Sequence, residues 1–166
     1  AFSSIAHMGW MAIILIYNPN LTLITFYLYT MMTSAIFLIM NSTNTLKLST
    51  VMTAWTKSPS LSTIFMLTLL SLAGLPPLTG FLPKWLIIQE LTKQELTMTA
   101  TTIALLSLLG LFFYLRLAYC ATITLPPNIT NYMKQWQTNK PTSILTTTLT
   151  TLSITLLPLS PMLFTI

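Results

Sequence analysis

A single lysine inside an apolar stretch is the residue of this sequence most suited to chemistry. Lys84 is the only charged residue between positions 59 and 88, and it follows Gly80 by four residues. A lysine at the centre of a bilayer costs at least about 2.5 kcal/mol, so such a residue is usually retained for a function. Because an ammonium group removed from water holds its proton less tightly, Lys84 is a candidate for proton transfer. The alternative is that its long side chain reaches an aqueous interface and only anchors a helix.

The only histidine of the sequence, His7, is the second candidate. Ser3 and Ser4 precede it by four and three residues, so in a helix their hydroxyls would lie on the same face as the imidazole. A titratable imidazole with hydroxyl neighbours is suited to proton transfer through side chains and water. The alternative is a neutral histidine that is satisfied by hydrogen bonds within a helical bundle.

The remaining reactive side chains give weaker signals. Glu90 and Glu95 are the only acids, and Glu90 lies three residues before Lys93, a spacing that predicts a surface ion pair. An acid–base role for Glu90 is the weaker alternative. Arg116 is expected to reach an interface or to pair inside a bundle. A single cysteine, Cys120, excludes an internal disulfide and also an iron–sulfur cluster held by four thiolates of this chain.

Several classes of function are excluded by what the sequence lacks. Its four glycines form neither a dinucleotide-binding fingerprint nor a phosphate-binding loop, and no zinc-binding spacing or pair of catalytic carboxylates is present. The seven lysines and arginines occur singly along the chain, whereas nucleic-acid binding requires them in clusters. We therefore expect no cofactor, metal or nucleic acid to bind this chain.

Composition indicates the solvent in which these candidate residues are placed. Of 166 residues, 54% are hydrophobic and 5% are charged, whereas an average soluble domain carries about 25% charged residues. Most of the surface must therefore face lipid, and in lipid a chain of this kind spans as α-helices. The predicted fold class is all-α, a polytopic transmembrane helical bundle.

Charge-free stretches and turn signals divide the chain into helices within one partial membrane domain over residues 1–166. The helices are expected at about 1–17, 21–41, 59–73 with 81–92, 97–123 and 142–164, with polar connections at 41–58 and 126–141. Two glycines and two prolines within residues 74–80 cannot continue an ordinary helix, yet apolar sequence resumes directly afterwards. We therefore expect residues 59–92 to form one discontinuous helix. The apolar residues around His7, Gly9 and Trp10 are typical of the interior of a helix, so we expect the sequence to be part of a longer one.

Two motifs resemble a known family. Residues 1–11 are similar to a segment A-Y-S-S-I-x-H-M-G-W-M of the antiporter-like membrane subunits of respiratory complex I, with Phe2 in place of the tyrosine. Residues 70–85, LSLAGLPPLTGFLPKW, closely resemble the broken-helix segment of the same family. The stretches 113–116 and 134–136 are also similar to it, and the likeness follows the chain in order from residue 1 to residue 166.

The resemblance implies a function in proton translocation. It implies a multi-pass subunit of the mitochondrial inner membrane that packs against other membrane-arm subunits. NAD, FMN, iron–sulfur and ubiquinone sites would lie on other subunits. By resemblance, Lys84 matches the lysine on the family's discontinuous helix, and His7 matches the histidine of the first motif. Both are then expected to belong to a proton relay. Phe2 lacks the hydroxyl of the tyrosine that the family has at this position, so a hydrogen bond made by that hydroxyl in the family cannot be carried over to this chain.

Three hypotheses follow from residues and resemblance together. The first is a proton-translocating subunit that couples electron transfer in NADH:ubiquinone oxidoreductase to pumping. The second is a structural membrane subunit without a proton path of its own. The third is a related cation/proton antiporter outside respiration. These relatives share the broken helix, so the longer motif match favours the first.

Overall fold

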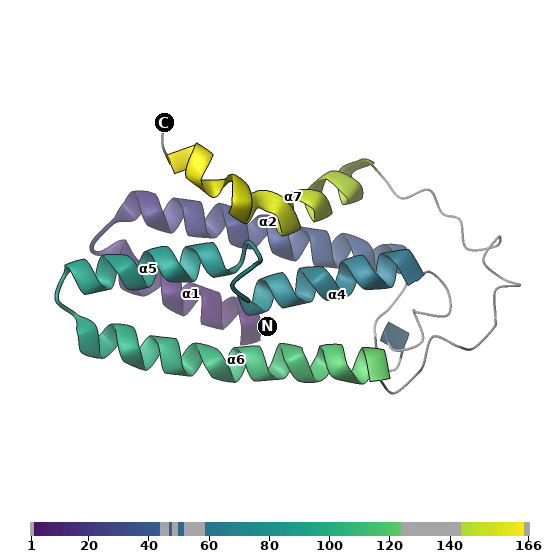
Figure 1. The fold of residues 1–166 in the computed structure, drawn as a ribbon, viewed down its shortest axis with the longest axis horizontal. Coiled ribbons are helices and arrows are strands. Elements are labelled where there is room, and N and C mark those ends of the chain that lie inside the picture. Colours follow the sequence, from purple (N-terminus) through teal and green to yellow (C-terminus); the bar gives the residue numbers. More distant parts are fainter. Residues whose placement is uncertain (1, 44–46, 48–49, 52–58, 124–143, 165–166) are drawn as a thin grey trace, which may run out of the picture.

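The computed structural model describes residues 2–43, 47, 50–51, 59–123 and 144–164, and every regular element among them is a helix. The prediction of an all-α fold is therefore confirmed for this part of the chain (Figure 1). The helices are α1 (Phe2–Leu15), α2 (Pro19–Thr43), α4 (Pro59–Ala73), α5 (Phe81–Lys93), α6 (Thr97–Ile123) and α7 (Ile144–Phe164).

The bounds of these helices lie within two residues of the positions expected from the sequence. The start of α2 shows the physical reason for one difference. The sequence placed a turn at 18–20, but Asn18 accepts a hydrogen bond from the backbone N–H of Leu21 at 3.3 Å, and Pro19 is the first helical residue. The turn is thus also the cap of the helix. The polar connection expected over 126–141 lies outside the described residues, as does most of that over 41–58.

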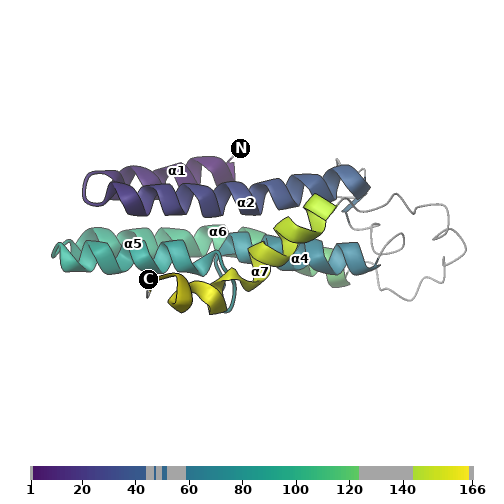
Figure 2. The same ribbon diagram turned by 90° about the horizontal axis from the view of Figure 1, so that it is seen from above.

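The helices are arranged around α2, which packs against α1, α4, α5 and α7. In both views α4 and α5 lie end to end along one line, and α6 runs beside the two of them (Figures 1 and 2). Helix α7 crosses α4 obliquely, as Figure 2 shows. The first turn of α1 lies close to the place where α4 ends and α5 begins, so segments far apart in the sequence meet at that point.

Apolar side chains form two clusters on either side of this meeting point. One joins α2, α4 and α6 around Met32, Phe65 and Leu69. The other joins α1, α5 and α6 around Ile14 and Leu91, both of which are fully buried. Because each cluster fixes one of the two end-to-end helices against α6, the segment between α4 and α5 is held from both sides.

Two helices, α2 and α6, are long and apolar enough to cross a membrane by length and composition. Helix α6 also exposes large apolar side chains along its length, among them Leu109, Phe112 and Phe113. Five threonines of α7 donate hydrogen bonds to carbonyls of the same helix. For example, Thr147 donates to the carbonyl of Ile144 at 2.8 Å, and such local bonds make threonine acceptable in lipid.

Candidate functional site

Residues 74–80, the α4–α5 connection, form short turns whose backbone groups bond to one another. The N–H of Gly74 donates to the carbonyl of Ser71 at 3.0 Å, and the N–H of Leu78 donates to Leu75 at 2.9 Å. Gly74 has a φ of 85°, the left-handed conformation that commonly ends a helix and that glycine adopts without strain. The glycine and proline run thus ends α4, and these bonds pair part of the backbone of the connection, as irregular backbone inside an apolar environment requires.

Gly80 lets the two helix ends come into direct contact. A Cβ atom at this position would lie 1.7 Å from the carbonyl oxygen of Ser71 and 2.7 Å from its carbon. The conformation of Gly80 is ordinary right-handed helix, with φ −65° and ψ −16°, so the requirement for glycine is one of space. The start of α5 is therefore pressed against the backbone of the last turn of α4.

Lys84 lies in the first turn of α5 and reaches back to the end of α4. Its Nζ donates a hydrogen bond to the carbonyl oxygen of Ala73 at 2.8 Å. Ala73 is the last residue of α4, and its carbonyl is one of those that a helix leaves without an internal partner. The negative end of the α4 dipole faces the amine, which favours a cation there. The side chain is half-buried and is directed into the fold, not outwards to an interface.

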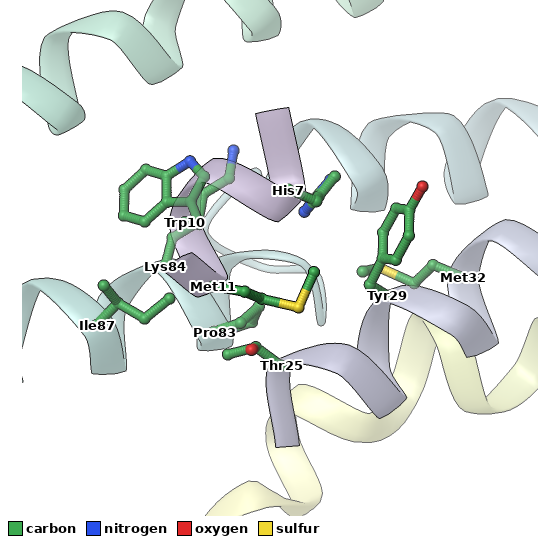
Figure 3. A pocket seen from close by; sticks show the side chains of 9 residues that line it. All are labelled: His7, Trp10, Met11, Thr25, Tyr29, Met32, Pro83, Lys84 and Ile87. Carbon is green, nitrogen blue, oxygen red and sulfur yellow. The ribbon is translucent and has the colours of Figure 1, made fainter. Parts of the chain in front are cut away.

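His7 is brought to the same place from α1. Its ring lies against that of Tyr29 of α2, with centroids 4.6 Å apart and planes tilted by 32°. Figure 3 shows His7, Tyr29 and Lys84, which come from three helices, among the side chains that line a small cavity.

Two cavities adjoin these residues, and the walls of both contain His7 and Lys84. The smaller, of about 10 Å³, lies between α1, α2 and α5. The larger, of about 590 Å³, is bounded by α1, α6 and the meeting ends of α4 and α5. A water molecule occupies roughly 30 Å³ in the liquid, so the larger cavity has room for several. The two candidate residues found in the sequence therefore share one site, whose other lining side chains are mostly apolar.

Two tyrosines of this site were not singled out from the sequence. Tyr29 stacks on His7, and Tyr114 of α6 lines the larger cavity together with Ser3 of α1. Each is one of several hydroxyl-bearing residues in a long apolar helix, so neither has a local signal. Their place in the site follows only from the packing of α1 against α2 and of the meeting helix ends against α6.

The sequence of this chain is similar to those of known protein families. Residues 1–112 match the family described as NADH:quinone oxidoreductase/Mrp antiporter, transmembrane. The chain belongs to that family. Residues 111–164 match the family described as the C-terminus of NADH dehydrogenase subunit 2. The described helices and the family together make this a multi-pass membrane protein.

Individual relatives of this antiporter-family chain agree with one another in name. The chain is 70% identical over 162 residues to NADH-ubiquinone oxidoreductase chain 2 of Struthio camelus, covering 98% of the chain and 47% of the relative. It is 68% identical to the same subunit of Sibirionetta formosa and 64% identical to that of Coturnix japonica, covering all of the chain and 48% of each relative. The chain thus spans about half the length of the curated relatives it matches.

The other charged residues that the structure describes lie apart from the site of Lys84 and His7. Lys93 and Glu90 form the predicted ion pair, with 3.5 Å between Nζ and Oε2 and with the lysine side chain 63% exposed. Arg116 is exposed on α6. Within the described ranges, no group of three or more histidine, cysteine or acidic side chains is placed to hold a metal ion.

Proposed function

We propose that this chain is part of a proton-translocating membrane-arm subunit of respiratory complex I in the mitochondrial inner membrane. We further propose that α4 and α5 are the halves of one discontinuous transmembrane helix, and that Lys84 and His7 belong to its proton relay. Membership of the antiporter family and the chain 2 relatives support the first statement. The end-to-end arrangement of α4 and α5 supports the second.

The observation that carries the proposal is the position of the Lys84 amine. It bonds the terminal carbonyl of α4 and faces cavities that also contain His7. The negative end of α4 stabilises the ammonium form, while burial and the positive end of α5 oppose it. Because these effects act in opposite directions, a modest change of charge nearby can shift the balance between the charged and neutral amine. A relay group needs that sensitivity.

His7 is the next group in the proposed path. Its imidazole can accept a proton at one nitrogen and release one at the other, and Lys84 lines the same two cavities. Two neighbouring cations repel each other, so protonation of either residue favours loss of the proton from the other. Water in the larger cavity would complete the transfer between the two side chains.

This role assigns the redox chemistry to other subunits. NAD, FMN, iron–sulfur clusters and ubiquinone would bind elsewhere in the complex, and this chain would supply proton-carrying side chains and contacts to neighbouring membrane-arm subunits and lipid. Energy from quinone reduction would reach Lys84 as a rearrangement of charge and water, because the relay responds to neighbouring charge.

Replacing Lys84 with methionine tests the proposal. Methionine keeps most of the length of the side chain but cannot carry a proton, so translocation through this subunit should stop. The measurement is the ratio of protons pumped to NADH oxidised, in assembled complex I that contains the full-length subunit. The matched control is Lys93→Met, which removes an exposed lysine of the same helix and only a surface ion pair worth less than about 1 kcal/mol.

Lys84→Arg separates a relay from a structural cation. Arginine keeps the positive charge and can still bond the end of α4, but it does not give up its proton in proteins. A relay predicts that the arginine variant pumps as poorly as the methionine variant. If arginine restores the normal ratio, the lysine only stabilises the structure. Sodium-dependent transport that is independent of NADH would instead favour the antiporter hypothesis.

A further inference from the structure

Thr79 lies next to the contact between α4 and α5 and has an unusual hydrogen bond. It immediately precedes Gly80 in the α4–α5 connection and is 2% exposed. Its hydroxyl donates to the backbone carbonyl of Ser153 in α7, which is 74 positions away in the chain. The same oxygen lies 3.9 Å from the sulfur of Met32 in α2. One side chain thus links the connection to two other helices.

This bond differs from those of the hydroxyls nearby. Thr68 and Ser71 are also fully buried, but each donates to a carbonyl three residues earlier in its own helix, at 2.8 Å and 2.7 Å. Such bonds satisfy the hydroxyl without joining one helix to another. In Thr79 the hydroxyl instead forms a tertiary contact, because it bonds the connection to α7.

The backbone of Thr79 is tied to the start of α5. Its carbonyl accepts a hydrogen bond from the N–H of Leu82 at 3.1 Å, and the next residue, Gly80, is in contact with the backbone of α4. Lys84 follows Thr79 by five residues, within the first turn of α5. A displacement of Thr79 therefore shifts the helix that carries the amine, and with it the bond between the amine and Ala73.

We propose that Thr79 is a positioning residue for Lys84 and that α7 acts on the relay lysine through it. This inference rests on the proposed function. Helix α7 packs on α2 and α4 and passes over the connection, as Figure 2 shows. With Thr79 bonded to α7, the connection keeps the shape that places the amine on the end of α4. Without that bond, the connection relaxes and the amine leaves the Ala73 carbonyl.

Thr79→Val tests this inference, because valine has the shape of threonine but cannot donate a hydrogen bond. Loss of one buried hydrogen bond changes an equilibrium by roughly fivefold, so the ratio of correctly placed to displaced amine should fall by about that factor. The expected result is a fall in proton pumping per NADH, by up to about that factor, in assembled complex I with assembly and NADH oxidation retained. Thr79→Ser, which keeps the donor, should restore pumping.

The matched control is Thr68→Val, which removes a buried hydroxyl of α4 that bonds only within its own helix. Normal pumping in this control, together with loss in Thr79→Val and recovery in Thr79→Ser, supports the inference. Normal pumping in Thr79→Val overturns it, and equal loss in Thr68→Val also overturns it, because any buried hydroxyl would then serve. If Lys84→Met itself pumps normally, the proposed function fails, and the two failures are thereby distinguished.

Discussion

Replacing Gly80 with alanine is expected to destabilise the protein more than any other single-methyl change at its glycines. The new Cβ would lie 1.7 Å from the carbonyl oxygen of Ser71, and backbone atoms cannot move aside as the end of a flexible side chain can. Extra methyl groups in a packed interior typically cost about 1–3 kcal/mol, and a clash between two backbones lies at the upper end or beyond. The helix ends must separate, which also disturbs the apolar clusters on either side.

The amount of assembled complex I that contains the variant subunit, and its midpoint of thermal inactivation, measure this effect. Gly110→Ala is the control, because nothing lies within 4 Å of a Cβ at that position in the middle of α6. Alanine there should be neutral or slightly stabilising, since it favours helix by up to about 1 kcal/mol over glycine. Equal stability of the two variants would contradict the close contact between α4 and α5.

The sequence predicted the helices well because their signals are local. Charge-free apolar stretches, prolines near helix starts and the run at 74–80 each act on the residues beside them, so the observed bounds differ from the expected ones by two residues at most. Lys84 and His7 could be selected for a similar reason. A titratable side chain is rare in such a sequence, and its burial is costly wherever the helices lie.

The partners of these residues could not be predicted, because they depend on how distant helices pack. Tyr29 and Thr79 are ordinary residues of an apolar sequence until α1 meets α2 and α7 crosses the connection. The effect of a methyl group at a glycine also depends on how the helices pack. The sequence marks Gly80 as part of a helix break, but only the arrangement of α4 against α5 shows that a methyl group is intolerable there and harmless at Gly110.

Replacing Gly74 with alanine is expected to impair the proposed proton transfer more than it impairs folding. Because φ at this position is 85°, the left-handed conformation would cost an alanine roughly 1–2 kcal/mol of conformational free energy. Its Cβ would also lie 2.8 Å from the Nζ of Lys84 and 3.1 Å from both Cδ and Cε. The lysine side chain is flexible and can move, so the fold survives. The amine, however, must leave the carbonyl of Ala73 to do so.

The ratio of protons pumped to NADH oxidised should therefore fall in Gly74→Ala while most of the complex still assembles. Gly9→Ala is the control, since Gly9 lines the larger cavity beside His7 but has nothing within 4 Å of a Cβ. A double variant, Gly74→Ala with Lys84→Met, shows whether the glycine acts through the lysine. Residues that act through one another give non-additive effects, so the double variant should pump no worse than Lys84→Met alone. A further loss in the double variant would mean that Gly74 serves the α4–α5 connection independently of the amine.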